Sequence, residues 1–206
     1  MLLGRFASGS IDKKIYLYDV RDESFSSWKI NEKPYVFHSA SVEDIIFSPV
    51  EDFKFASCNQ SLWCKCIIFL GSVDKTICIC DIRTGNYNKP ELSFKAHNSD
   101  VNVISWNQKN PFFIASGADD GSFKIWDYRN PSEEQTEIKW HTEQITSIDF
   151  QPGDESVVAV SSADNRLSIW DMSVEKDETK NKEGLNSVPE NLIFLHQGQE
   201  EIKEIK

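Results

Sequence analysis

The stretch HNSDVNVISWNQKNPFFIASGADDGSFKIWDYR, residues 97–129, decides the fold. Its apolar residues follow a period of two, with Val101 and Val103 on one side of an extended segment and Ile104 and Trp106 on the other. Both sides are largely apolar, which is typical of a strand buried inside a stack of sheets. An Asp-Asp-Gly turn signal separates two such runs. We therefore predict an all-β fold, because helical periodicity is absent almost everywhere.

The same pattern recurs along the chain. Copies of its second half end at four aspartates, Asp19, Asp81, Asp127 and Asp171. A His-led segment opens each of the later copies, at His38, His97 and His141. The last three aspartates are 46 and 44 positions apart, whereas the first two are 62 apart. A period near 45, with a His at the head and Trp-Asp at the tail, indicates a repeat architecture with four short strands in each unit.

This combination resembles the WD-repeat β-propeller family over residues 6 to about 172. The resemblance implies a buried hydrogen-bond chain among a His, a second-strand Ser or Thr, a turn Asp and a third-strand Trp. One repeat has all four members, His97, Ser116, Asp120 and Trp126. The next repeat has His141, Asp164 and Trp170, but Val160 stands where the hydroxyl is expected. Two earlier repeats depart further: one keeps His38, Ser57 and Asp74 with Cys80 in the Trp position, and the first has Tyr18 there.

The repeats divide the chain into a partial blade at 1–37, three further blades at 38–96, 97–140 and 141–195, and the start of another at 196–206. Residues 174–190 form a charged, acidic loop that we expect to be flexible. Three nearly complete blades cannot close a ring. The expected architecture is therefore a partial β-propeller, part of a longer propeller protein whose remaining blades would be its partners.

The broken period has a candidate cause in residues 59–71, NQSLWCKCIIFLG. Removing them aligns FASC-SVDKTICICD with FIASG-ADDGSFKIWD and reduces the interval of 62 to 49. The extra segment would lie in the tight turn between the second and third strands. Two explanations stay open: a retained in-frame intron, or a genuine loop.

Composition narrows the function classes. The net charge is -11, which favours a basic partner and disfavours direct binding to nucleic acid. The longest apolar run, Ile67-Ile68-Phe69-Leu70, is too short to cross a membrane as a helix. Five Cys without a signal peptide indicate a reducing compartment.

No chemistry of catalysis stands out. Cys64-Lys65-Cys66 and Cys78-Ile79-Cys80 have a C-x-C spacing that is unusual for zinc, so buried thiols are the better interpretation. His97, Ser116 and Asp120 recur in partial form in other repeats, as a structural device would, and no G-x-S-x-G motif is present. We therefore expect a protein without catalytic residues, metal or cofactor.

By analogy with the family, one face of the disc carries the binding loops. The residues placed there are mostly acidic: Glu43, Asp44, Ser99, Asp100, Asp119 and Glu143. They would suit a Lys- and Arg-rich ligand. Separately, Trp126-Asp127-Tyr128-Arg129 resembles the box of substrate receptors of cullin-based ubiquitin ligases, although an Arg at such a turn is common.

KPYVFHSASVEDIIFSP and LIFLHQGQEEIKEI, with the opening stretch, resemble a narrower branch of WD-repeat proteins. This branch includes histone-binding chaperones and ribosome-assembly factors. The resemblance implies a nuclear and nucleolar protein that escorts a basic large-subunit ribosomal protein, and core histones are a further candidate client. The alternative function is that of a ubiquitin-ligase substrate receptor that uses Arg129.

Overall fold

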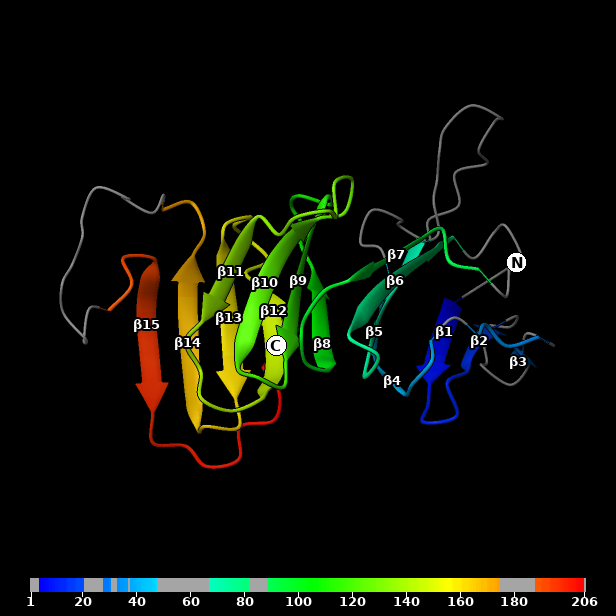
Figure 1. The fold of residues 1–206 in the computed structure, drawn as a ribbon, viewed down its shortest axis with the longest axis horizontal. Coiled ribbons are helices and arrows are strands. Elements are labelled where there is room, and N and C mark those ends of the chain that lie inside the picture. The colour runs from blue at the N-terminus through cyan, green and yellow to red at the C-terminus, as the bar shows by residue number, and fades with distance from the viewer. Residues whose placement is uncertain are drawn as a thin grey trace. The chain divides into compact units, whose positions relative to one another are not determined.

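A computed structural model of the chain describes residues 4–20, 28–30, 33–36, 38–47, 67–81, 89–174 and 188–205. Every regular element in these ranges is a β-strand, and the strands form four antiparallel sheets (Figure 1). The chain divides into two compact units, Met1–Ile104 and Ser105–Lys206. The expectation of an all-β fold is confirmed, and the sheets are consistent with a partial β-propeller.

The first unit contains two sheets. The first has three strands in chain order, β1 (Gly4–Gly9), β2 (Ile15–Val20) and β3 (Trp28–Ile30). The second has four, β4 (Val42–Phe47), β5 (Ile67–Ser72), β6 (Thr76–Asp81) and β7 (Leu92–Lys95). The core of this unit combines Ile15 and Leu17 of the first sheet, Val42, Cys78 and Cys80 of the second, and Tyr35 of the connecting segment, which forms a bridge with Ile15.

The third sheet consists of β8 (Val101–Trp106), β9 (Phe113–Ala118), β10 (Ser122–Asp127) and β11 (Thr136–Lys139). The fourth consists of β12 (Ile145–Phe150), β13 (Val157–Ser162), β14 (Arg166–Asp171) and β15 (Leu192–Gln197). Figure 1 shows these last four strands side by side in that order. Consecutive pairing of four short strands is the arrangement that the sequence repeat predicts.

One turn repeats in all four sheets: it joins β1 to β2 in the first sheet and the second strand to the third in each of the others. One residue in each turn has a positive φ: Lys13 at 67°, Lys75 at 69°, Gly121 at 76° and Asn165 at 64°. Each donates its N–H to the carbonyl three residues earlier, at 3.0–3.3 Å. At Gly121 a side chain would not fit, because a Cβ would lie 2.2 Å from the carbonyl oxygen of His141. The shared turn fixes the alignment of the repeats residue by residue.

One predicted element lies elsewhere in the structure. The sequence comparison assigned FASC at 55–58 to the second strand and 59–71 to an insertion after it. The structure instead places the second strand at β5, which pairs with β4 on one side and β6 on the other. Ile67-Ile68-Phe69-Leu70 is the stronger strand former, since β-branched and aromatic residues favour a central strand. The similarity of FASC to the IASG of the third sheet misled the alignment.

The extra length therefore belongs to a different connection. The chain has 19 residues between β4 and β5, but 6 between β8 and β9 and 6 between β12 and β13. The excess matches the 13 residues expected from the broken period, and it falls within 48–66, outside the described residues. Most of the acidic loop, residues 175–187, is also outside them. In the described part of the chain, no helix has the length and apolar character needed to cross a membrane.

Candidate protein-binding face

A buried hydrogen-bond chain holds the fourth sheet together. Asp164 accepts from His141 Nδ1 at 3.0 Å and from the backbone N–H of Thr142 at 3.1 Å. His141 Nε2 lies 2.8 Å from Ser168 Oγ, which also accepts from Trp170 Nε1 at 2.8 Å. These hydrogen bonds anchor the loop before β12 to β14 and to the turn that precedes it. They therefore fix one of the loops that would carry a binding face.

Ser168 belongs to this hydrogen-bond chain, but the sequence analysis did not predict it. The family pattern places the hydroxyl on the second strand, where this repeat has Val160. Val160 and Ser168 are cross-strand partners, so a hydroxyl on the third strand reaches the same pocket. The signal was available in the sequence, because Ser168 lies two residues before Trp170 and therefore faces the same side.

The third sheet has the arrangement that the pattern predicts for its serine and tryptophan. Trp126 Nε1 donates to Ser116 Oγ at 2.9 Å, and both residues are buried. Asp120 accepts from the backbone N–H and the hydroxyl of Ser122 in the turn. His97 is buried in the first unit, and its pairing with Asp120 in the second stays a prediction.

The first sheet substitutes a tyrosine for the tryptophan. Tyr18 Oη lies 3.1 Å from Ser8 Oγ, the position that matches the Trp126–Ser116 bond.

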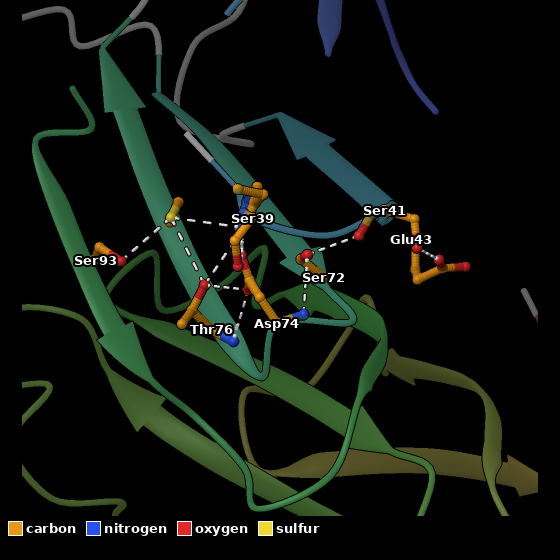
Figure 2. Close-up of polar contacts among 9 residues, drawn as sticks. Ser39, Ser41, Glu43, Ser72, Asp74, Thr76 and Ser93 are labelled. Atoms are coloured by element: carbon orange, nitrogen blue, oxygen red, sulfur yellow. Dashed lines mark hydrogen bonds and ion pairs between the residues drawn. The ribbon is translucent and has the colours of Figure 1, made fainter. Parts of the chain in front are cut away.

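The second sheet has an incomplete chain (Figure 2). His38 Nδ1 lies 2.9 Å from Asp74, which also accepts from the hydroxyl of Thr76 and the N–H of Ser39. Burial opposes ionisation of Asp74, but hydrogen bonds from Thr76 and the proximity of His38 together lower its pKa. His38 Nε2 is buried without a partner, because Cys78 stands where the fourth sheet has Ser168 and its thiol lies nearer Ser93, at 3.3 Å.

Asp44 has a structural contact that the sequence did not reveal. Its Oδ2 accepts the backbone N–H of Ile104 at 2.9 Å, and its Oδ1 accepts that of Ile45 at 2.8 Å. Ser147 fills the same position in the fourth sheet and accepts the N–H of Ile205 at 3.2 Å. The side chain at this position therefore ties one repeat to the segment that opens the next.

Replacing Asp44 tests whether it acts as a tie or as a contact for a partner. Asp44→Ala leaves the N–H of the buried Ile104 without its acceptor, so we expect a loss of about 1–3 kcal/mol in the free energy of unfolding. Asp44→Asn keeps one oxygen acceptor and should lose less. Urea unfolding followed by circular dichroism measures both. Unchanged stability in Asp44→Ala would mean that this carboxylate is not a tie.

The remaining predicted face residues are carried by loops and strand ends of both units. Glu43 is exposed and accepts from the hydroxyl of Ser41, while Ser99 and Asp100 are half-buried in the loop before β8. In the second unit, Asp119 and Glu143 are exposed. Their loops adjoin, because the turn at Gly121 packs on the backbone of His141 and Glu143. The structure thus brings Asp119 and Glu143 onto neighbouring loops.

Charge divides unequally between the two units. Residues 1–104 carry 12 basic and 13 acidic side chains, whereas residues 105–206 carry 10 basic and 20 acidic ones. In the first unit, Lys75 and Lys95 also lie beside the loop that precedes β8, since each donates to Asn98 at 2.9 Å. In the second unit, Glu200 and Glu201 are exposed in the loop after β15, the loop that corresponds to the one before β8. The N–H of Glu201 donates to Asn165 in the turn between β13 and β14. The sequence prediction included none of these two lysines and two glutamates. Glu200 and Glu201 could have been found, because they occupy the same loop of their repeat as Ser99 and Asp100 do in theirs.

Arg129 is exposed but already engaged. Its guanidinium pairs with both oxygens of Asp127, at 2.6 Å for the shortest contact, and it lies over the ring of Phe112 at 3.9 Å from the centroid. The hydrogen bond from Arg129 is the main cause of the lowered pKa of Asp127. These contacts place the guanidinium beside Asp127 and Phe112 at the end of β10.

The cysteine pair on β6 has the environment of packed thiols. Cys78 and Cys80 are free and buried, and burial raises the pKa of each. Among the described residues, no three His, Cys, Asp or Glu side chains group so that they could hold a metal ion. Cys64 and Cys66 lie outside the described residues.

Comparisons with known proteins agree with this architecture. The model of the family "WD domain, G-beta repeat" matches residues 88–127 and 132–171. The chain is 38% identical to ribosome assembly protein rrb1 of Schizosaccharomyces pombe over 193 residues, 88% of this chain and 37% of that protein. It is 40% identical to protein HEAT STRESS TOLERANT DWD 1 of Arabidopsis thaliana, over 98% of this chain and 42% of that protein.

A third relative is WD-40 repeat-containing protein MSI3 of Arabidopsis thaliana, 30% identical over 50% of this chain and 24% of that protein. The chain thus spans about two fifths of the length of the first two relatives. Each matched repeat begins with the last strand of one sheet and continues through the first three strands of the next, β7–β10 for residues 88–127 and β11–β14 for residues 132–171. Both end in Trp-Asp, and the tryptophan of each makes a buried hydrogen bond. The chain is a WD-repeat protein, related to ribosome assembly protein rrb1.

Proposed function

We propose that the protein is a non-enzymatic scaffold that binds a basic client protein during ribosome assembly in the nucleus and nucleolus. The client class is a large-subunit ribosomal protein, with core histones as a second basic client. The observation that carries the proposal is the excess of acidic side chains in residues 105–206, combined with the similarity to a ribosome assembly protein.

The mechanism follows from charge. A newly made ribosomal protein is strongly basic and binds nucleic acid indiscriminately unless its charge is neutralised. A rigid acidic surface screens that charge, and rRNA then takes over the client because it offers far more phosphate. The scaffold needs no direct contact with nucleic acid and no membrane.

The charge distribution favours the second unit as the client surface. Its face carries the exposed Asp119 and Glu143 on adjoining loops. In the first unit, Asp44 is occupied by backbone N–H groups, and Lys75 and Lys95 add positive charge beside the loop. A basic client therefore meets a more favourable potential on the second unit.

Affinity capture from nuclear extract at low and high salt tests this function. Mass spectrometry should identify one basic client that is lost as the salt concentration rises, because salt screens exposed charges. Capture of the same client at both salt concentrations would contradict an electrostatic mechanism. Absence of any ribosomal protein or histone would contradict the proposal itself.

The rival function, a substrate receptor of a cullin-based ubiquitin ligase, rests on Arg129. The guanidinium is exposed and lies beside Asp127 and Phe112, so a partner can reach it. Capture of ligase subunits at high salt, lost in Arg129→Ala, would favour this function. Under the client-scaffold proposal, Arg129→Ala leaves client capture unchanged.

A further inference from the structure

The hydroxyl of Ser168 has three polar neighbours, so its proton has a choice of acceptors. Its Oγ lies 2.8 Å from His141 Nε2, 2.8 Å from Trp170 Nε1 and 3.4 Å from the carbonyl oxygen of Val160. The indole is always a donor, so it occupies one acceptor site of the oxygen. The hydroxyl proton can then point either to His141 or to Val160.

These two directions correspond to two charge states of His141. In the neutral ring, Nδ1–H donates to Asp164, and Nε2 accepts from the hydroxyl. In the protonated ring, Nε2–H donates to Ser168 Oγ, which has a second acceptor site, and the hydroxyl proton turns to Val160. Every buried polar atom named keeps a partner in both states.

We propose that Ser168 is a hydroxyl rotor that lets the fourth sheet keep its buried hydrogen-bond chain when His141 gains a proton. The sheet would then respond to acid by turning one hydroxyl instead of by opening. The second sheet has no such device, since His38 Nε2 is buried without a partner.

The charged groups around His141 set the pH range of this response. Burial lowers its pKa below the usual 6.5, Asp164 acts in the opposite direction, and Arg166 adds to the lowering. The turn that packs on the His141 backbone contributes Asp120, which is paired with Lys139 at 3.9 Å. Because the folded pKa lies below the unfolded value, the stabilising contribution is complete above pH 6.5 and is lost as the pH falls below it.

Histidine nitrogen shifts in NMR test the rotor. The folded protein should show the Nδ1–H tautomer at neutral pH, and the Trp170 indole N–H should stay hydrogen-bonded, seen as slow exchange with solvent, through the titration of His141. Ser168→Ala removes the acceptor for the charged ring, and charge-assisted bonds are the stronger ones, so the pKa of His141 should fall below that of the wild type. Ser168→Thr keeps the hydroxyl and should restore the wild-type pKa.

Two results would overturn the proposal. One is a pKa of His141 that is unchanged or raised in Ser168→Ala. The other needs no variant: loss of the Trp170 indole hydrogen bond as His141 is protonated in the wild type would show that the chain breaks instead of rearranging. If Ser168→Ala does not fold, this second measurement still decides.

Discussion

Trp170→Ala is expected to be the most destabilising single substitution in the second unit, with a loss of roughly 3–5 kcal/mol in the free energy of unfolding. The side chain is fully buried, and its ring packs against Phe123 at 5.6 Å and Trp140 at 5.9 Å between centroids. Truncation leaves a cavity among aromatic rings and removes the indole donor of Ser168. Calorimetric unfolding of wild type and variant measures the change.

Trp170→Phe separates packing from hydrogen bonding. It keeps most of the aromatic volume but removes the indole N–H, so its loss should be nearer that of one buried hydrogen bond, about 1–2 kcal/mol. Phe194→Ala provides a control, since that ring is about half exposed on the outer strand β15. Equal losses for Trp170→Ala and Phe194→Ala would mean that the aromatic cluster does not stabilise the unit.

Much of the fold follows from the repeated pattern. Alternating apolar residues, a His at the head and an Asp at the tail predicted four-strand sheets, and the shared turn at Lys75, Gly121 and Asn165 explains why the repeats align. The placement of β5 did not follow, because two segments competed for one strand. The repeat comparison assigned the strand to FASC because of its short match to IASG, although Ile67–Leu70, which lies in β5, has the stronger strand propensity. Propensity was the better physical guide there.

The site was less predictable because side-chain partners depend on three-dimensional neighbours. Ser168 replaces a hydroxyl that the family pattern places on the opposite strand. Asp44 was assigned to a binding face although its carboxylate accepts two backbone N–H groups, one of them from a residue 60 positions away. No periodicity shows such a contact. By contrast, the exposure of Asp119 and Glu143 agrees with the loop positions expected from the repeat.

Charge reversal on the second unit should weaken client binding more than the same reversal on the first. We expect Asp119→Lys combined with Glu143→Lys to reduce affinity for a basic client by about tenfold or more, since like charges placed against each other cost several kcal/mol. Both side chains are exposed, so the substitutions should leave the fold intact. Binding of a purified ribosomal protein or histone at fixed salt, measured by calorimetry, gives the comparison.

Glu43→Lys combined with Asp100→Lys is the matched control, because it changes the net charge by the same amount. If net charge alone attracted the client, the two double variants would lose affinity equally. A larger loss from Asp119 and Glu143 would locate the client on the second unit, where acidic residues outnumber basic ones by 20 to 10. A larger loss from Glu43 and Asp100 would place it on the first unit, despite Lys75 and Lys95 beside that loop. In either case the difference between the pairs should shrink as salt rises, because exposed charges are screened beyond a distance of about 8 Å at physiological ionic strength.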